Sequence, residues 1–279
     1  MGKLATDAGM RVMIDFHYSD FWADPAKQKA PKAWADMTIA EKTAAVKDYT
    51  MNSLNTLLDA GVDVGMVQVG NETNNGIAGE NGLENANTTA IFRAGCEAIQ
   101  QVEQERSRVI KAVVHFANPE KQNYMTYADE LAKTGVEYDV FASSYYPYWH
   151  GTLDNLKNQL NAITENYGKE VMVAETSWAT GLEDSDGHAN TVREGNNDAG
   201  MDYDFSIYGQ AKELREVINT VAEMNKGIGV FYWEPAWIPV KVYDPEAEDA
   251  EQTLATNKAV WEKYGSGWAA SYAKESDAE

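Results

Sequence analysis

The chain has 279 residues, of which 44% are hydrophobic and 11% aromatic, so it can bury the core of one large domain. Its formal net charge of −21 argues against a nucleic-acid partner, because phosphate binding needs a basic surface, whereas a neutral ligand is indifferent to this charge. With one cysteine, no membrane-spanning apolar run and no apolar signal region at the N-terminus, the sequence argues against an intrachain disulfide and a membrane protein.

A unit recurs along the chain, in which an amphipathic helical stretch ends at a glycine and a β-rich apolar run follows. A glycine at this position tolerates the left-handed backbone that ends many helices. The helix-ending glycines are Gly9, Gly61, Gly135, Gly168 and Gly227. The predicted strands are Arg11–Phe16, Met66–Val69, Val109–Val114, Tyr138–Ser143, Val171–Ala174 and Ile228–Trp233.

The strands and helices alternate, which is typical of parallel α/β folds. The strands are nearly continuous apolar runs, as expected for a parallel sheet covered on both faces. Thr38-x-x-Glu41 is a capping box that predicts a helix to about Asp59, and apolar residues recur at helical spacing from Ile207 to Met224. The pattern predicts either a barrel or a doubly wound sheet.

Six strands are two fewer than a complete eight-stranded barrel needs. The chain opens in what resembles the last turn of a helix, Leu4 to Ala8, and closes in a polar tail, Lys274 to Glu279. We therefore expect residues 1–279 to form one domain that is a fragment or a short form of a longer barrel.

Polar residues follow the predicted strands, where the reactive groups of such barrels lie. These residues are Asp15 and His17, Asn71 and Glu72, His115, Tyr145 and Tyr146, Glu175, and Trp233 with Glu234. Taken singly, a glutamate after a strand is more often a surface residue. Two of them, Glu72 preceded by Asn and Glu175 followed by Thr-Ser-Trp, favour an active site.

Two facing carboxylates are the minimum for cleavage of a glycosidic bond. One donates a proton to the leaving oxygen, and the other attacks the anomeric carbon when the two are about 5–5.5 Å apart. Glu72 and Glu175 are the candidates, and Asn71 is expected to bind the sugar 2-hydroxyl group. From the residues alone, His17 and His115 either line this site or are hydrogen-bonded histidines of the barrel interior.

Two short motifs, Val69-Gly-Asn-Glu-Thr and Val173-Ala-Glu-Thr-Ser, resemble glycoside hydrolase clan A. More narrowly, the chain resembles glycoside hydrolase family 53, the endo-β-1,4-galactanases, from about Leu4 to Ala273. The specific segments are Asp15-Phe-His-Tyr-Ser-Asp-Phe-Trp-Ala-Asp-Pro-Ala-Lys-Gln, Ala30-Pro-Lys-Ala-Trp, Gly229-Val-Phe-Tyr-Trp-Glu-Pro-Ala-Trp-Ile-Pro and Gly265-Ser-Gly-Trp-Ala.

The resemblance implies a (β/α)8 TIM barrel whose third to eighth strands are the six counted here. The first two strands, with an arginine near the nucleophile, and the last helix would be lacking, which would expose sheet edges. The implied protein is a secreted, extracellular retaining endo-β-1,4-galactanase that acts as a monomer on the neutral β-1,4-galactan of type I arabinogalactan. The alternative is a truncated, inactive or non-catalytic galactan-binding fragment of such an enzyme.

The resemblance also implies a role for each candidate residue. Glu72 would be the acid/base and Glu175 the nucleophile. Tyr145 or Tyr146 would hydrogen-bond the nucleophile. The cleavage subsite would be lined by Asp15, His17, Asn71, His115 and Trp233, with Trp237 as a stacking platform.

A second constellation, Asp184-x-Asp186-Gly-His188-x-Asn190, places oxygen donors around a glycine, as suits calcium. On spacing alone a solvated loop is favoured over a metal site. The family resemblance shifts the expectation to a structural Ca²⁺, with His188 contributing its backbone carbonyl. No organic cofactor is expected.

Another clan A activity, such as that of a mannanase or a cellulase, would share both glutamates. It does not explain the segment Asp15–Trp34, and we therefore favour the galactanase.

Overall fold

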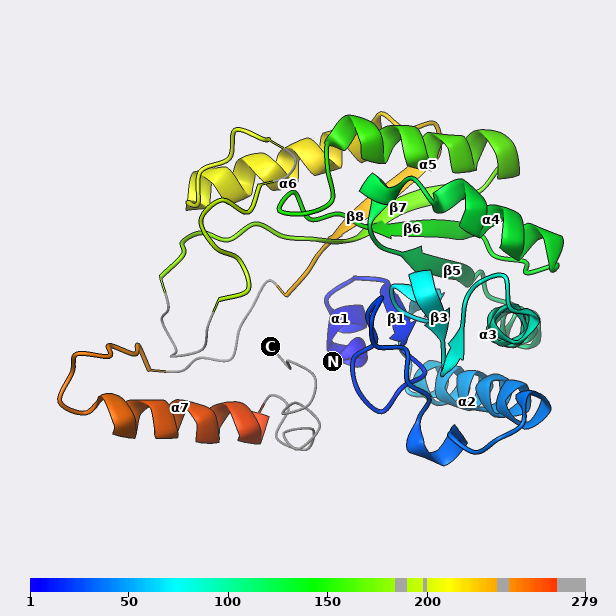
Figure 1. The fold of residues 1–279 in the computed structure, drawn as a ribbon. Coiled ribbons are helices and arrows are strands. Elements are labelled where there is room, and N and C mark those ends of the chain that lie inside the picture. Colours follow the sequence, from blue (N-terminus) through cyan, green and yellow to red (C-terminus); the bar gives the residue numbers. More distant parts are fainter. Residues whose placement is uncertain (184–189, 198–199, 235–240, 265–279) are drawn as a thin grey trace.

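The structure, a computed structural model, describes residues 1–183, 190–197, 200–234 and 241–264. Its centre is a six-stranded parallel sheet with the strand order β1-β2-β5-β6-β7-β8. The sheet curves into part of a barrel (Figure 1), which agrees with the predicted fold class. The strands are β1 (Val12–Phe16), β2 (Val64–Val69), β5 (Lys111–Phe116), β6 (Val140–Ser144), β7 (Glu170–Thr176) and β8 (Gly227–Tyr232).

Helices alternate with these strands and cover the outer face of the sheet (Figure 1). The covering helices are α2 (Ile39–Asp59), α3 (Ala86–Arg106), α4 (Tyr124–Lys133), α5 (Leu153–Tyr167) and α6 (Ile207–Ala222). The short α1 (Gly2–Asp7) precedes β1, and α7 (Ala250–Tyr264) lies apart from the sheet (Figure 1). Three short 3₁₀ turns lie at Lys32–Trp34, Thr73–Asn75 and Pro119–Lys121, and a small hairpin pairs β3 (Gly76–Ile77) with β4 (Glu80–Asn81). No helix in these described ranges has the length and apolar character needed to cross a membrane.

The start of α2 shows why the chain forms a helix there. The Thr38 hydroxyl accepts a hydrogen bond from the Glu41 backbone N–H at 3.4 Å, and the Glu41 carboxylate accepts one from the Thr38 backbone N–H at 2.9 Å. This reciprocal cap satisfies two backbone donors that have no partner within the helix. The helix predicted from the capping box is therefore confirmed.

The helix-ending glycines are confirmed at four of the five predicted positions. Gly9, Gly61, Gly135 and Gly168 have positive φ angles of 83°, 78°, 71° and 69°. The prediction for Gly227 is wrong, because this residue begins β8. A Cβ atom there would lie 1.9 Å from the Val221 carbonyl oxygen, so glycine is needed for close approach to the end of α6.

The two faces of the sheet carry separate apolar clusters, because successive side chains of a strand point to opposite faces. On β6, Phe141 packs in the large core that includes the helices, whereas its neighbours Val140 and Ala142 belong to a smaller cluster. The smaller cluster also contains Val113, Met172 and Ala174, with Met13 and Met66 packed against it. It forms the inner face of the barrel segment, on which the polar residues described below continue.

The sheet is open in the described part of the chain, with β1 and β8 at its edges. On β8, Ile228 and Phe231 are 39% and 38% exposed. The predicted exposed edges are thus observed. The sequence pattern did not predict α7, which follows β8, and the predicted polar tail Lys274 to Glu279 lies outside the described residues.

Candidate active site

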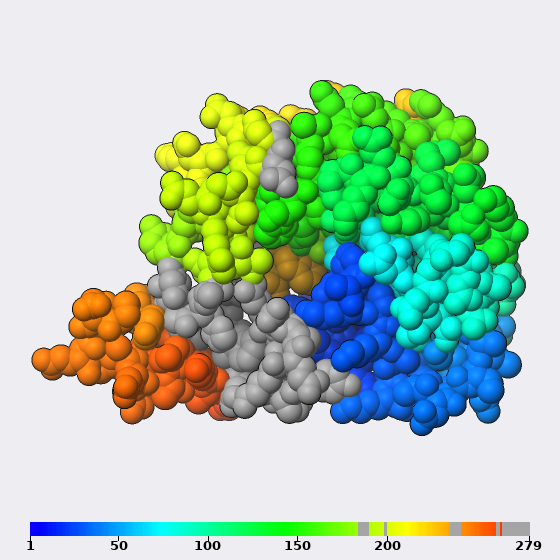
Figure 2. Space-filling view, in the orientation of Figure 1, coloured from blue at the N-terminus to red at the C-terminus, as the bar shows by residue number. Residues whose placement is uncertain are grey.

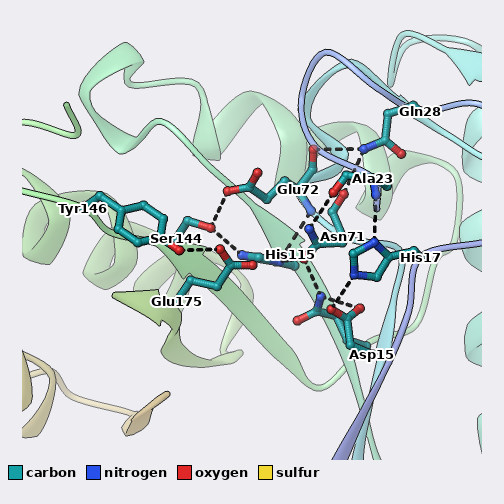
Figure 3. Close-up of polar contacts among 11 residues, drawn as sticks. Asp15, His17, Ala23, Gln28, Asn71, Glu72, His115, Ser144, Tyr146 and Glu175 are labelled. Atoms are coloured by element: carbon teal, nitrogen blue, oxygen red, sulfur yellow. Dashed lines mark hydrogen bonds and ion pairs between the residues drawn. The ribbon is translucent and has the colours of Figure 1, made fainter. Parts of the chain in front are cut away.

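Polar side chains from five neighbouring strands meet at the carboxyl-terminal end of the sheet (Figure 3). In four strands the polar residue stands two positions after an inner-face apolar residue, so it points to the same face. The pairs are Met13 and Asp15, Met66 and Gln68, Val113 and His115, and Ala142 and Ser144. The period of two within each strand therefore builds one polar layer on top of the inner apolar cluster.

Glu175 reaches this layer through an irregularity in β7. Val173 packs in the outer core, so regular alternation would turn Glu175 outward as well. The register with β6 shifts between Ser143, which pairs with Val173, and Ser144, which pairs with Glu175. A bulge of this kind re-aims a side chain, and here it brings Glu175 to the inner face beside Ser144.

Glu72 lies just beyond β2, on a backbone with φ 45° and ψ 53°. This left-handed conformation is uncommon for a residue with a side chain and is held by its neighbours. Gly70, with φ 79°, precedes it, and a Cβ atom there would lie 2.6 Å from both Ile77 and Thr73. The Thr73 hydroxyl donates to the His115 carbonyl oxygen at 2.8 Å and ties the turn to β5.

The two carboxyl groups are close to each other and largely withdrawn from water. One oxygen of Glu72, one oxygen of Glu175 and one ring nitrogen of His115 all lie within 4.8 Å of one another. Burial raises the pKa of Glu72 to about 7. Burial and the charge of Glu72 likewise raise the pKa of Glu175 above its ordinary value. Two such carboxyls cannot both ionise easily, so the pair retains one proton near neutral pH.

Each carboxyl group has a hydroxyl neighbour, Tyr146 beside Glu175 and Ser144 beside Glu72. The Tyr146 phenol donates to its Oε2 at 2.8 Å, and this bond lowers the pKa of Glu175. Burial and the charge of Glu175 raise the pKa of Tyr146 above its ordinary value, so the phenol stays protonated and remains a donor. The hydrogen bond favours the ionised form of Glu175.

Glu72 is joined to a chain of three side chains. Its Oε1 lies 2.6 Å from Ser144 Oγ, which lies 2.9 Å from His115 Nε2. His115 Nδ1 lies 2.8 Å from Asn71 Oδ1. Burial lowers the pKa of His115 to about 3, so its imidazole is neutral.

Asn71 is oriented by groups on both sides. Its Nδ2 donates to the Ala23 carbonyl at 2.8 Å, and its Oδ1 accepts from Gln68 Nε2 at 3.1 Å. Gln68 Nε2 also donates to Asp15 at 2.8 Å. His17 Nε2 lies 3.1 Å from the same aspartate, and His17 Nδ1 accepts from the Ala23 backbone N–H at 2.8 Å. The segment after β1 is thereby fastened to the turn that carries Glu72.

The structure separates the two candidate tyrosines. Tyr146 is the residue that contacts Glu175, whereas the fully buried Tyr145 hydroxyl donates to the Gly151 carbonyl at 3.0 Å. Tyr145 therefore cannot line a subsite, and that prediction is wrong. His115 is also fully buried, so it does not line the subsite. It lies beneath Glu72 and matches the alternative reading of a hydrogen-bonded histidine of the barrel interior.

The aromatic candidates are only partly described. Trp233 is half-buried and its indole lies edge-on to Trp22, with ring centroids 6.1 Å apart. Trp22 is 41% exposed at the rim. Trp237 lies outside the described residues, as do Asp184, Asp186 and His188, so the structure does not test their predicted roles. Asn190 is described, and its Nδ2 donates to the Leu182 carbonyl at 2.9 Å.

The sequence pattern did not identify three residues of the site. Ser144 contacts Glu72, Gln68 links Asn71 to Asp15, and Gln28 donates to the backbone carbonyl of Asn71 at 2.8 Å. Gln68 stands alone as a polar residue in an apolar strand, and Ser144 ends one. A polar residue inside an otherwise apolar strand is the signal that could have identified both.

Glu72, His115 and Glu175 are also close enough to hold a metal ion. Both ring nitrogens of His115 already have partners, Ser144 on one side and Asn71 on the other. Occupied nitrogens of this kind cannot serve as ligands without breaking the network. The arrangement fits a coupled pair of carboxyl groups better than a metal centre.

Comparison with known proteins agrees with this geometry. The sequence model of glycosyl hydrolase family 53 matches residues 1–277. The chain is 50% identical over 281 residues to an endo-beta-1,4-galactanase of Bacillus subtilis, a match that covers 100% of the chain and 62% of that protein. It is 35% identical to an arabinogalactan endo-beta-1,4-galactanase of Cellvibrio japonicus, over 86% of the chain and 65% of the relative. The chain thus spans less than two thirds of the length of either relative.

Solved structures show the same relationship. The family 53 catalytic domain of Ignisphaera aggregans superposes with a TM-score of 0.79 at 38% identity, covering 86% of this chain and 68% of that one. The match of the family model to nearly every residue and the similarity of fold lead to one conclusion. The chain belongs to glycosyl hydrolase family 53.

Proposed function

We propose that the chain carries the active site of an endo-β-1,4-galactanase, which hydrolyses β-1,4-galactosidic bonds of type I arabinogalactan with retention of configuration. The observation that carries this proposal is the approach of Glu72 and Glu175 oxygens to within 4.8 Å. Retaining enzymes keep their carboxyl groups about 5–5.5 Å apart, whereas inverting enzymes leave about 6.5–9.5 Å for a water molecule. The names of the two galactanase relatives support the choice of substrate.

In the first step, the ionised Glu175 carboxylate attacks the anomeric carbon while Glu72 gives its proton to the leaving glycosidic oxygen. The bond between that carbon and oxygen breaks, and a galactosyl ester of Glu175 forms. Tyr146 holds the carboxylate in its charged form before the attack. The segment from Trp22 to Gln28 borders the site through the contacts of Ala23 and Gln28 with Asn71.

In the second step, Glu72 acts as a base. Esterification removes the charge of Glu175, so the pKa of Glu72 falls and the carboxylate of Glu72 can take a proton from water. The water oxygen attacks the anomeric carbon, and the ester bond to Glu175 breaks. Two displacements on opposite faces of the sugar restore the original configuration.

The test is the release of reducing ends from pectic galactan by the purified chain and by Glu72→Gln and Glu175→Gln variants. Both variants should be inactive. Glu170→Gln, on the same strand but at its opposite end, is the matched control and should retain activity, because its ion pair with Lys111 is half-exposed. Near-normal hydrolysis by either active-site variant would contradict the assignment. Binding of galactan without hydrolysis by the unaltered chain would favour the alternative of a non-catalytic galactan-binding fragment, which the comparisons do not favour.

We also propose a structural Ca²⁺ in the loop that contains Asp184, Asp186, His188 and Asn190. The support is the alternation of oxygen donors and the family resemblance. Within the described residues, the amide nitrogen of Asn190 is used by Leu182, which leaves the amide oxygen as the atom suited to a hard cation. An extracellular location and a monomeric state are further parts of the proposal, and the net charge of −21 does not oppose the binding of a neutral polysaccharide.

A further inference from the structure

The hydrogen-bond chain beneath Glu72 has a direction that can be worked out by counting protons. Each link holds one proton, and the groups at the Asn71 end favour one arrangement of these protons. The Ala23 carbonyl can only accept, so the Asn71 atom facing it is the NH₂ group. The Asn71 oxygen therefore faces His115 Nδ1 at 2.8 Å, and this ring nitrogen carries the hydrogen.

The next two links follow from the first. The imidazole is neutral, so a hydrogen on Nδ1 leaves Nε2 with a lone pair. Ser144 Oγ, 2.9 Å from Nε2, then donates its only proton to His115. The serine then cannot also donate across its 2.6 Å contact with Glu72 Oε1, so this link is a hydrogen bond only when Glu72 is a carboxylic acid and donates to Ser144 Oγ.

We propose that Asn71, His115 and Ser144 form a directed hydrogen-bond chain in which Ser144 accepts a proton from Glu72, so that Ser144 and His115 are positioning residues that hold Glu72 in its acid form. The proposal rests on the proposed function for the role of Glu72. When Glu72 gives up its proton, the serine hydroxyl can turn to the carboxylate only by leaving His115 Nε2 without a donor. The hydrogen-bond chain thus opposes ionisation of Glu72 before the leaving oxygen takes its proton.

The direction of the chain reverses the usual effect of a serine on a carboxyl. As a donor to the Glu72 carboxylate, the Ser144 hydroxyl would lower the pKa of Glu72. A serine that accepts from the carboxylic acid stabilises the protonated form and raises the pKa. The two arrangements therefore predict shifts of opposite sign when the serine is removed.

Other charges that act on Glu72 come from several elements and stay in place in such a variant. Asp15 and Asp24, at the end of β1 and in the loop after it, raise the pKa of Glu72, and His17 lowers it. The remaining titratable groups that face the carboxyl pair or the chain are Glu175 on β7, Tyr146 and His150 after β6, Tyr124 on α4 and Glu234 after β8.

The alternative tautomer is the competing possibility. The Glu72 backbone N–H lies 3.4 Å from His115 Nδ1 and would donate to it if the hydrogen were on Nε2. That arrangement would set the Asn71 oxygen and Nδ1 as two acceptors 2.8 Å apart. The shorter contact is a normal hydrogen bond only with the hydrogen on Nδ1.

The first experiment needs no substrate. Imidazole ¹⁵N spectra of the labelled chain distinguish a protonated ring nitrogen from a bare one, and His115 is assigned by the loss of its signals in His115→Gln. We expect Nδ1 protonated and Nε2 bare at pH 5, and a change in the Nε2 shift as Glu72 ionises. Glu72→Gln, whose amide donates like the carboxylic acid, should keep the pH 5 pattern at every pH. A hydrogen on Nε2 at pH 5 would overturn the proposal, whatever the activity of the chain.

The second experiment uses the pH profile of kcat/KM on galactan, whose basic limb reports ionisation of the acid. Ser144→Ala should move that limb to lower pH by about one unit, the size expected for loss of one hydrogen bond. Ser143→Ala is the matched control, because the neighbouring hydroxyl contacts Tyr124 and not Glu72, and it should leave the limb in place. Ser144→Thr keeps the hydroxyl, so its basic limb should lie at the same pH as that of the unaltered protein. A shift to higher pH, or no shift, in Ser144→Ala would overturn the proposal, whereas loss of activity in every variant and in the parent would count only against the proposed function.

Discussion

Removal of one hydroxyl group from Tyr146 tests which carboxyl group is the nucleophile. In Tyr146→Phe the hydrogen bond of 2.8 Å to Glu175 is lost while the ring remains. A hydrogen bond to a charged group contributes about 1.5–3 kcal/mol, and one pKa unit corresponds to about 1.4 kcal/mol. Because the phenol stabilises the ionised form of Glu175, its loss raises the pKa of that carboxyl by about one to two units.

The assay is the pH dependence of galactan hydrolysis, in which the acidic limb reports ionisation of the nucleophile. The acidic limb of Tyr146→Phe should move to higher pH by about one to two units, with about a 10- to 100-fold loss of rate below that limb and recovery above it. Tyr145→Phe is the matched control, because the adjacent hydroxyl contacts the Gly151 carbonyl instead of Glu175. An acidic limb that stays in place or moves to lower pH in Tyr146→Phe would refute the role of the phenol.

Three further changes follow from other parts of the structure. Gly70→Ala should lower the free energy of unfolding by about 2–4 kcal/mol, because the new Cβ atom clashes with Ile77 and Thr73 and the backbone is left-handed. Gly135→Ala has the same left-handed strain but open space around it, so it should lower the free energy of unfolding by only about 1 kcal/mol. Equal losses for the two variants in urea titrations would contradict this reasoning. Burial raises the pKa of Glu213 to about 7, so the folded state binds its proton more tightly than the unfolded state, and stability falls as pH rises from about 4.5 to 7. Glu213→Gln should remove up to about 3 kcal/mol of that fall, and the exposed Glu223→Gln should not. Chelation by EDTA should lower the Tm, with recovery on adding Ca²⁺, and an unchanged Tm would argue against the metal site.

The sequence was sufficient to predict the strands and the two glutamates, because both depend on local patterns. Apolar runs mark strands that are buried on both faces, and residues after such strands share one edge of a parallel sheet. Glu72 and Glu175 were identified in this way, and the structure brings their oxygens within 4.8 Å. Their chemical roles stay predictions until the variants are measured.

The supporting residues were harder to predict, because their roles depend on direction and register. Tyr145 and Tyr146 are adjacent in sequence, and only the orientation at the end of β6 decides which of them reaches Glu175. The bulge in β7 that turns Glu175 inward has no sequence signature of its own. His115 was expected at the surface of the subsite, yet the period of two in β5 buries it completely beneath Glu72.

The two carboxyl groups differ less in burial than in the partners that the strands supply. Both have raised pKa values for the same reason, withdrawal from water, so burial alone cannot assign acid and nucleophile. Glu175 faces a phenol that can only be a donor to a carboxylate, and in the proposed hydrogen-bond chain Glu72 faces a serine that gives its proton to His115. With the proposed direction of the hydrogen-bond chain, this difference in partners predicts the proton on Glu72 and the charge on Glu175.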